Sequence, residues 1–295
     1  MHRSERRSDL SEITAMTYTV KSELLEVTVN DLGAELSSVK FQGKEKLWQN
    51  ETGEWAGKAP VLFPVCGRCS MIVEGTEYPI PFHGVAKKSV FALTEQTENS
   101  LSFTLSSSEE TKKVYPFDFE FTITYTVNGA ELEISFEVYN PAEKALYFSC
   151  GSHESYVLDK EISEYKLVAE KEEEWIHSPY EDKLTDQEVF LAKGKELPLP
   201  EDILSGSNTL IMSGLRSGGV SLCEKSGKKV VDISFKDFSN LLLWRPGNVK
   251  MVCIEPWSNL PDRAADEKKE FSQKAGVLKV EPNESKTIVR TIMYY

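Results

Sequence analysis

Residues 117–138 read FDFEFTITYTVNGAELEISFEV, and this stretch decides the fold class. Apolar side chains occupy every second position over residues 117–127 and again over residues 132–138. This period of two is the pattern of a β-strand that buries one of its faces. The Asn128-Gly129 pair between the two runs predicts a tight hairpin turn with both residues at positive φ. The stretch therefore predicts two antiparallel strands joined by a short turn.

The rest of the chain continues this pattern. Further alternating or β-branched runs lie at residues 25–29, 101–105, 231–235, 249–253 and 287–295. Only residues 263–274 predict a helix, and this short, highly charged segment is expected to be a surface connector. Glycine fingerprints of nucleotide-binding folds, internal repeats and flexible linkers are all missing. We therefore predict an all-β protein, a large antiparallel β-sandwich formed as one domain by residues 16–295, after a disordered tail of residues 1–15.

Composition and charge narrow the possible partners. With 47 acidic and 34 basic residues, the chain of 295 residues has a formal net charge of −13, which repels nucleic acid and anionic membranes. No apolar run approaches the roughly 20 residues that cross a bilayer, and the basic, polar opening lacks the hydrophobic segment of a signal peptide. Five cysteines without a secretory signal fit reduced thiols better than a disulfide framework. We expect a soluble, cytoplasmic protein, monomeric or homodimeric, that acts on a small molecule.

Four short segments place chemically reactive side chains beside glycine or proline. They are residues 60–68 (PVLFPVCGR), 82–87 (FHGVAK), 150–153 (CGSH) and 254–258 (IEPWS). In order and spacing they resemble the aldose 1-epimerase (galactose mutarotase) family, most closely its shorter bacterial members. The resemblance spans Tyr18 to Ile292, and its supporting pieces are residues 31–36 (DLGAEL), Trp48, Asp237-Phe238 ahead of Leu243-Trp244, and residues 262–274. It implies the galactose mutarotase-like supersandwich and an enzyme that needs no metal or cofactor.

The resemblance also implies roles for individual residues. Glu255 corresponds to the general base that takes a proton from the anomeric hydroxyl of a sugar. His153 corresponds to the general acid that protonates the ring oxygen. His83 corresponds to the histidine that binds and polarises the sugar, and Arg68 to an arginine that donates to a sugar hydroxyl.

The reaction explains these residue types without reference to the family. Opening and reclosing a hemiacetal requires one group that takes a proton and one that gives a proton, and both histidine and a tuned carboxylate can titrate near neutral pH. Glycoside hydrolysis would require two carboxylates about 5 to 9.5 Å apart, whereas the motifs supply only Glu255. Trp257 lies two positions beyond Glu255, hence on the same face of a strand, where its flat ring suits the C–H face of a pyranose.

The chain departs from the family pattern at three places. Lys87 stands where the His-Gly segment usually has arginine, so a point charge replaces a planar fork. Glu154 follows His153 where proline is usual. Asn208 stands where relatives often carry an aspartate near the substrate. These changes leave the proton-transfer residues intact and make Lys87 and Asn208 candidates for binding a different sugar.

Other interpretations remain open from the sequence. The altered flanks of the two histidines allow a non-catalytic carbohydrate-binding or sensing protein on the same fold. A hexose phosphate is a further possible substrate, for which Arg68, Lys87 and Arg245 could supply cations. The Cys66-x-x-Cys69 spacing has neither the βαβ pattern of a redox motif nor a second ligand pair for zinc, so we predict no metal site there. We expect structural roles only for His2, in the tail, and for His177.

Overall fold

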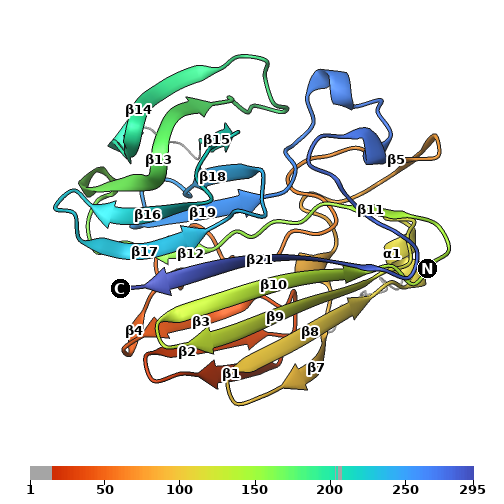
Figure 1. Ribbon diagram of the computed structural model, residues 1–295, viewed down its shortest axis with the longest axis horizontal. Helices are drawn as coiled ribbons and strands as arrows, with labels where there is room; N and C mark the ends of the chain where they lie inside the picture. The colour runs from red at the N-terminus through yellow and green to blue at the C-terminus, as the bar shows by residue number, and fades with distance from the viewer. Residues whose placement is uncertain (1–14, 203, 205–207) are drawn as a thin grey trace, which may run out of the picture.

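The computed structural model describes residues 15–202, 204 and 208–295, so nearly all of the expected tail lies outside the described residues. Within these ranges the protein is built almost entirely from antiparallel strands (Figure 1). The first four strands form a small sheet in the order β1-β2-β3-β4. They are β1 (Thr17–Lys21), β2 (Leu25–Asn30), β3 (Leu36–Phe41) and β4 (Lys44–Glu45).

A sheet of 13 strands forms the rest of the sandwich. Its order is β12-β19-β18-β15-β13-β16-β17-β21-β10-β9-β8-β7, with β14 paired to β13. Its strands are β7 (Ala92–Gln96), β8 (Ser100–Ser106), β9 (Glu120–Asn128), β10 (Glu131–Tyr139), β12 (Ser155–Val157), β13 (Tyr165–His177), β14 (Val189–Pro198), β15 (Leu210–Ser213), β16 (Gly219–Glu224), β17 (Lys229–Ser234), β18 (Asn240–Trp244), β19 (Met251–Trp257) and β21 (Ser285–Tyr294). The predicted all-β antiparallel sandwich is therefore confirmed.

Short elements complete the described structure. Two-stranded pairs are formed by β5 (Met71–Val73) with β6 (Thr76–Tyr78), and by β11 (Leu146–Phe148) with β20 (Leu278–Val280). The helical elements are α1 (Glu109–Lys112) and the 3-10 turns η1 (Ala86–Lys88), η2 (Ile162–Glu164), η4 (Ala264–Asp266) and η5 (Phe271–Gln273). The α-helix has only four residues, and none of the helical segments in the described part of the chain has the length or apolar character to cross a membrane.

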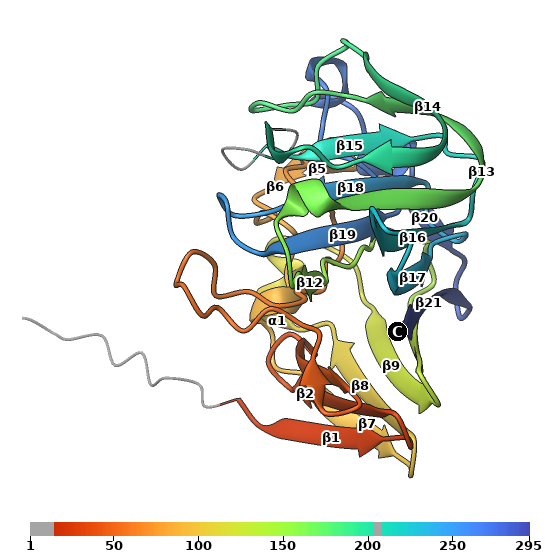
Figure 2. The same ribbon diagram turned by 90° about the vertical axis from the view of Figure 1, so that its left-hand side faces the viewer.

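The small sheet packs face to face on one end of the large sheet. In Figure 2 the strands β1 and β2 lie against β7 and β8 as a separate layer. The rings of Tyr18 on β1 and Phe103 on β8 are 5.5 Å apart, and the hydroxyl of Tyr125 on β9 donates to Ala34 O (2.6 Å). Alternate residues of β9 and β10 are buried between the layers, as the period of two predicts. Apolar burial on these facing strands is the main source of stability for the sandwich.

The hairpin between β9 and β10 differs in detail from the prediction. Asn128 is still paired, opposite Glu131, and the two-residue loop is Gly129-Ala130. Gly129 has a φ of 57°, whereas Asn128 is not among the residues with positive φ. The expectation of two positive φ values at Asn128-Gly129 was therefore wrong, because the turn begins one residue later and only its first position needs glycine.

The predicted helix at residues 263–274 was also wrong. The segment forms the two 3-10 turns η4 and η5 instead. The Asp266 side chain accepts from the main-chain N–H of Arg263, a local bond that favours a turn over a continuing helix. Phe271 is fully buried and Lys274 points inward to the Asp262 carboxylate (2.6 Å), so packing fixes the path of this segment.

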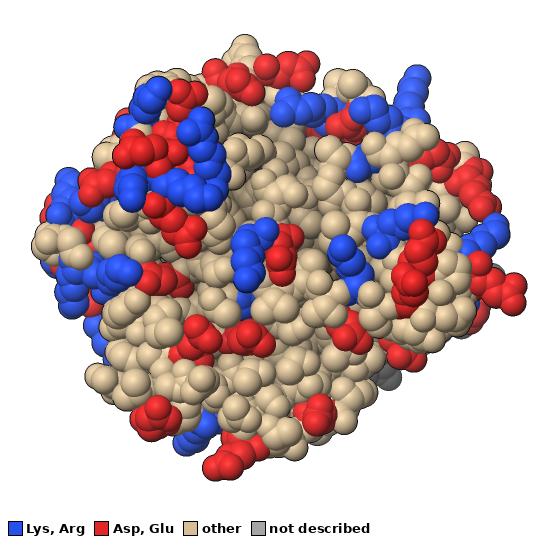
Figure 3. All heavy atoms as spheres, in the orientation of Figure 1, with Lys and Arg blue, Asp and Glu red and all other residues tan. Residues whose placement is uncertain are grey.

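The molecular surface is mixed in charge. On the face seen in Figure 3, Lys and Arg side chains lie beside Asp and Glu side chains, and neither sign forms one continuous patch. Exposed ion pairs of this kind contribute little to stability.

Candidate active site

The four sequence motifs are joined to one another by main-chain hydrogen bonds. Residues 60–68 bond to the segments that contain His83 and His153, and the latter segment bonds to the end of β19, which carries Glu255. These bonds are Leu62 N to Gly151 O (3.0 Å), Gly151 N to Leu62 O (3.1 Å), Val85 N to Phe63 O (2.7 Å) and Ser152 N to Pro256 O (3.1 Å). The side chains that each motif carries are thereby brought to one place in the fold.

A close approach of main chains makes one glycine of these motifs necessary. Gly84 has a φ of 76°, and a Cβ at this position would lie 2.1 Å from the carbonyl oxygen of Phe63. Only glycine adopts this positive φ without strain and lacks the Cβ that would collide with Phe63. Since the preceding residue is His83, itself at a φ of 65°, this tight turn fixes the direction of the imidazole.

The motifs surround a cavity of ≈ 720 Å³, within the size range of small-molecule sites. Five of the seven predicted site residues line it: His83, Lys87, His153, Glu255 and Trp257. Arg68 and Asn208 are exposed and are not among the lining residues. The neighbour of Asn208 in the chain, Thr209, lines the cavity instead.

The central feature of the cavity is a buried carboxylate–imidazole pair. His153 Nε2 lies 3.4 Å from Glu255 Oε2, and only 8% of His153 and 1% of Glu255 are exposed. Burial raises the pKa of the Glu255 carboxyl well above its usual value, and the nearby Glu154 raises it further, while Trp257 partly offsets both. Burial also lowers the pKa of His153 to about 3. The low-dielectric site thus favours one shared proton and no net charge on the pair.

Two polar atoms of this pair have no hydrogen-bond partner among the residues that the structure describes. Glu255 Oε1 and His153 Nδ1 are buried and form no hydrogen bond of good geometry. Buried polar groups are nearly always hydrogen-bonded, and exceptions often mark sites where a ligand or water binds. These atoms are therefore candidates to contact a bound molecule.

His83 is held as a hydrogen-bond donor to the cavity. Its Nδ1 accepts from the main-chain N–H of Gly67 (2.9 Å), which leaves the proton of the neutral ring on Nε2. Burial lowers the pKa of His83 well below its usual value, with smaller contributions from His153 and Lys87. Its ring is perpendicular to that of His153 at a centroid distance of 5.8 Å. His83 therefore stays neutral and can donate from Nε2 to an oxygen of a bound molecule.

Aromatic rings form much of the cavity wall. Trp257 contacts His83 at a centroid distance of 5.4 Å, whereas Trp55 and Trp244 contact His153 at 5.2 and 5.7 Å. The sequence predicted a sugar platform only for Trp257. That interpretation missed Trp55 and Trp244, which line the cavity. Trp244 carried a signal, since it belongs to one of the pieces that resemble the aldose 1-epimerase family.

Glu35 was also missed by sequence reasoning. It lines the cavity, and its Oε1 accepts from the main-chain N–H groups of Lys58 (2.8 Å) and Ala59 (2.9 Å). Burial raises its pKa, and the main-chain N–H groups of Lys58 and Ala59 partly offset this, with a smaller contribution from the Lys87 charge. The Gly-Ala-Glu sequence at residues 33–35 was noted as part of the resemblance, but nothing in it indicated a cavity residue.

A buried ionic network lies behind the acid–base pair. Arg290 on β21 has no exposed side-chain surface and is paired with Glu154, which is almost fully buried. Arg290 also bonds to the hydroxyls of Ser152 and Tyr156. Because Ser152 and Glu154 flank His153, this network ties the histidine to a central strand of the large sheet.

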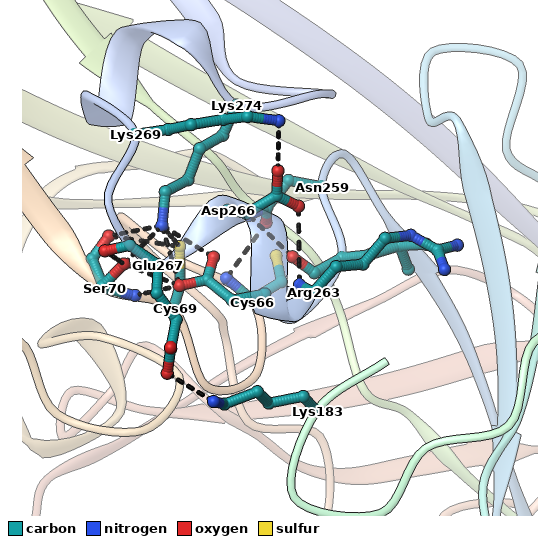
Figure 4. A network of polar contacts seen from close by, with 12 residues as sticks. Cys66, Cys69, Ser70, Lys183, Asn259, Arg263, Asp266, Glu267, Lys269 and Lys274 are labelled. Atoms are coloured by element: carbon teal, nitrogen blue, oxygen red, sulfur yellow. Dashed lines mark hydrogen bonds and ion pairs between the residues drawn. The ribbon is translucent and has the colours of Figure 1, made fainter. Parts of the chain in front are cut away.

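Cys66 and Cys69 lie in a separate buried polar cluster (Figure 4). The Lys274 ammonium is 3.5 Å from Cys69 Sγ and donates to Ser70 O (2.8 Å) and to the Asp262 carboxylate. Burial raises the pKa of Cys69 to about 12, so its thiol keeps its proton and is a poor nucleophile. The cluster instead links the motif at residues 60–68 to the segment that follows β19, through hydrogen bonds from Cys66 N to Asn259 and from Ser70 N to Asp262.

The fold and the cavity together define a class of protein: galactose mutarotase-like sandwiches with a carboxylate and two histidines in the pocket. A family model described as aldose 1-epimerase matches residues 16–279, so this chain belongs to the aldose 1-epimerase family, as the motifs predicted.

Similar proteins agree with this assignment. The plasmid and chromosomal forms of protein LacX from Lactococcus lactis subsp. lactis are each 32% identical over 287 residues, covering 90% of this chain and 95% of LacX. A galactose mutarotase related enzyme from Lactobacillus acidophilus is 28% identical with a TM-score of 0.85, covering 95% of this chain and 97% of that chain. A galactose mutarotase-like protein from Lactobacillus casei, 21% identical with a TM-score of 0.86 over 95% of this chain and 100% of its own, shares the fold.

Proposed function

We propose that this protein is an aldose 1-epimerase that interconverts the α and β anomers of a hexose. The observation that carries the proposal is the buried pair of His153 and Glu255, 3.4 Å apart in a cavity that His83 also lines. A single proton shared by the pair is sufficient for the reaction, because mutarotation removes one proton and adds another.

In the empty cavity, burial favours the shared proton on Glu255. In the proposed mechanism, hydrogen bonds from the bound sugar stabilise the ionic form of the pair, so the proton moves to His153 before the reaction begins. Glu255 takes the proton of the anomeric hydroxyl, the bond between C1 and the ring oxygen breaks, and His153 gives its proton to that oxygen. His83 donates a hydrogen bond from Nε2 to a sugar oxygen. After rotation about the C1–C2 bond, the steps run in reverse on the other face of the carbonyl, and the protons return to their starting places.

The cavity favours an uncharged hexose over a hexose phosphate. Of the three cations proposed for a phosphate, only Lys87 lines the cavity. Its neighbour Lys88 also lines it, but the two lysines share the lining with two carboxyl groups, those of Glu35 and Glu255. Arg245 is buried and paired with Glu201 (2.7 Å), and Arg68 is exposed outside the lining. The tryptophan walls suit the C–H faces of a pyranose. We therefore expect the 6-phosphate to bring no gain in rate.

Polarimetry tests the proposal. Freshly dissolved α-D-glucose and α-D-galactose should approach equilibrium rotation faster with the wild-type protein than with buffer, in a buffer that contains EDTA. Glu255→Gln should lose about 10²–10⁴-fold of this acceleration, the usual contribution of a general base. Glu133→Gln, an exposed glutamate on β10, is the matched control and should behave as wild type.

Three other outcomes would each contradict a different part of the proposal. Sugar binding detected by calorimetry without any acceleration, over a panel of aldoses, would replace the enzyme by a carbohydrate-binding protein. A strong preference for hexose 6-phosphates would show that the substrate is a sugar phosphate and not the uncharged hexose proposed here. Full activity of Glu255→Gln would remove this residue as the base.

A further inference from the structure

One side chain that can bind a metal, the thiol of Cys253, lies next to the acid–base pair and has no part in the sugar chemistry. Cys253 lies two positions before Glu255 on β19, so both side chains are on the same face of the sheet. His153 precedes β12, which pairs with β19 through Ser155 and Cys253. One ligand atom each from His153, Cys253 and Glu255 lies within 4.8 Å of the others. The thiol of Cys253 is fully buried.

The donor set matches that of a thiophilic divalent cation. Thiolate, imidazole and carboxylate are the ligands of Zn²⁺, with bond lengths of about 2.3 Å to sulfur and about 2.0–2.2 Å to nitrogen and oxygen. Tetrahedral bonds of these lengths separate the ligand atoms by roughly 3.3–3.6 Å. His153 Nε2 and Glu255 Oε2 already have such a separation, 3.4 Å. Mg²⁺ and Ca²⁺ prefer oxygen ligands, which this site does not supply in sufficient number.

The surroundings of the three residues also point to a ligand. Among the described residues, Glu255 Oε1 has no hydrogen-bond partner, so this carboxylate has an oxygen available to a cation. His153 and Glu255 line the cavity while Cys253 lies beneath it, so a fourth coordination position would face the cavity and could hold water or a sugar oxygen. Three protein ligands with one open position is the arrangement of metal sites that exchange ligands.

We infer that His153, Cys253 and Glu255 form a site for Zn²⁺ or a similar thiophilic divalent cation, and that the bound cation blocks mutarotation. Binding forms bonds to sulfur, nitrogen and oxygen and releases the thiol proton, together with the carboxyl proton when Glu255 carries it. No electron is transferred. The cation occupies the base and the acid of the proposed mechanism, so the blocking effect rests on the proposed function, whereas the binding does not.

Cobalt spectroscopy tests the binding without any activity measurement. Co²⁺ added to the wild-type protein should produce a thiolate-to-cobalt charge-transfer band in the near ultraviolet, and Zn²⁺ should abolish that band by displacement. Cys253→Ala should lack the band, and Cys253→Ser provides a second variant if the alanine variant does not fold. Cys223→Ala removes a thiol on β16, away from these ligands, and should keep the band.

Inhibition is then measured by polarimetry, with each variant compared with its own rate in EDTA. Zn²⁺ should inhibit the wild type and Cys223→Ala alike, EDTA should reverse the inhibition, and equal Mg²⁺ should have no effect. Cys253→Ala should need at least about tenfold more Zn²⁺ for the same inhibition, a loss typical of weakened metal sites.

The two proposals fail separately. Absence of a charge-transfer band in the wild type, or an equal band in Cys253→Ala, would overturn the metal site even if the protein is an active mutarotase. A thiolate band in a protein without mutarotase activity would keep the metal site and overturn the proposed function. A band without inhibition of an active enzyme would overturn the blocking effect.

Discussion

Glu255 and His153 have opposite pKa shifts with the same cause. Each is removed from water at the base of the cavity, so each favours its uncharged form. A sugar hydroxyl that bonds to either group would restore part of the lost solvation and stabilise the ionic form of the pair. The pair is therefore expected to behave as one proton-carrying unit and not as two independent catalysts.

A double-mutant cycle tests this expectation. Glu255→Gln and His153→Asn should each lower the catalysed rate by about 10²–10⁴-fold. The double variant should lose at most about tenfold more than the worse single variant, because groups that act as a unit are strongly non-additive. Polarimetric rate constants at saturating sugar, divided by the protein concentration, supply the values. If the rate loss of the double variant equalled the product of the two single losses, Glu255 and His153 would contribute to the rate independently.

Individual site residues could be predicted only where a motif carried them. Glu255, His153 and His83 stand in short segments whose residue types match the chemistry, and the structure brings all three to one cavity. Trp55 and Glu35 reach the same cavity from loops that have no periodicity and no reactive neighbour in the sequence. Their position depends on long-range packing, which a local pattern does not encode. The catalytic roles themselves stay predictions.

At the scale of elements, alternation predicted the strands well because burial of one face is a local property. The order of the strands in the sheet was not predictable in this way. β12 pairs with β19, which lies about a hundred residues further along the chain, and this pairing sets His153 beside Glu255. The error at residues 263–274 has the same origin, since Phe271 is fully buried and Lys274 bonds to Ser70, 204 positions earlier in the chain.

The ion pair between Arg290 and Glu154 connects two such elements, β21 and the segment before β12. Arg290→Met should lower the free energy of unfolding by about 3–5 kcal/mol, because it leaves Glu154 buried and uncompensated. The double variant Arg290→Met/Glu154→Gln should recover part of this loss, since it removes the buried charge. Chemical denaturation measures both. Equal stability of the single and double variants would contradict the argument.

At the scale of the whole molecule, the three described histidines share one property. The pKa of His83 lies well below 6.5, that of His153 is lowered to about 3, and that of His177 is also lowered, each mainly because of burial. The folded protein therefore holds these histidines neutral, whereas the unfolded chain takes up protons on them below pH 6.5. Because only the unfolded state binds these protons, the free energy of unfolding should fall as the pH falls below about 6.5.

The variant His83→Asn isolates the contribution of His83 to this pH dependence of stability. Asparagine cannot be protonated, so the variant should lose less stability than the wild type on acidification. From about pH 7.5 to about pH 5.5, the stability of the wild type relative to the variant should fall by about 1.4 kcal/mol, the cost of keeping one buried histidine neutral one unit below its unfolded pKa. Chemical denaturation in EDTA at both pH values gives the free energies of unfolding of the two proteins. Any loss of stability from the substitution that is the same at both pH values cancels in the comparison. If the two proteins lost stability in parallel, His83 would take up a proton as readily in the fold as in the unfolded chain. The protonated ring could not accept the hydrogen bond from Gly67.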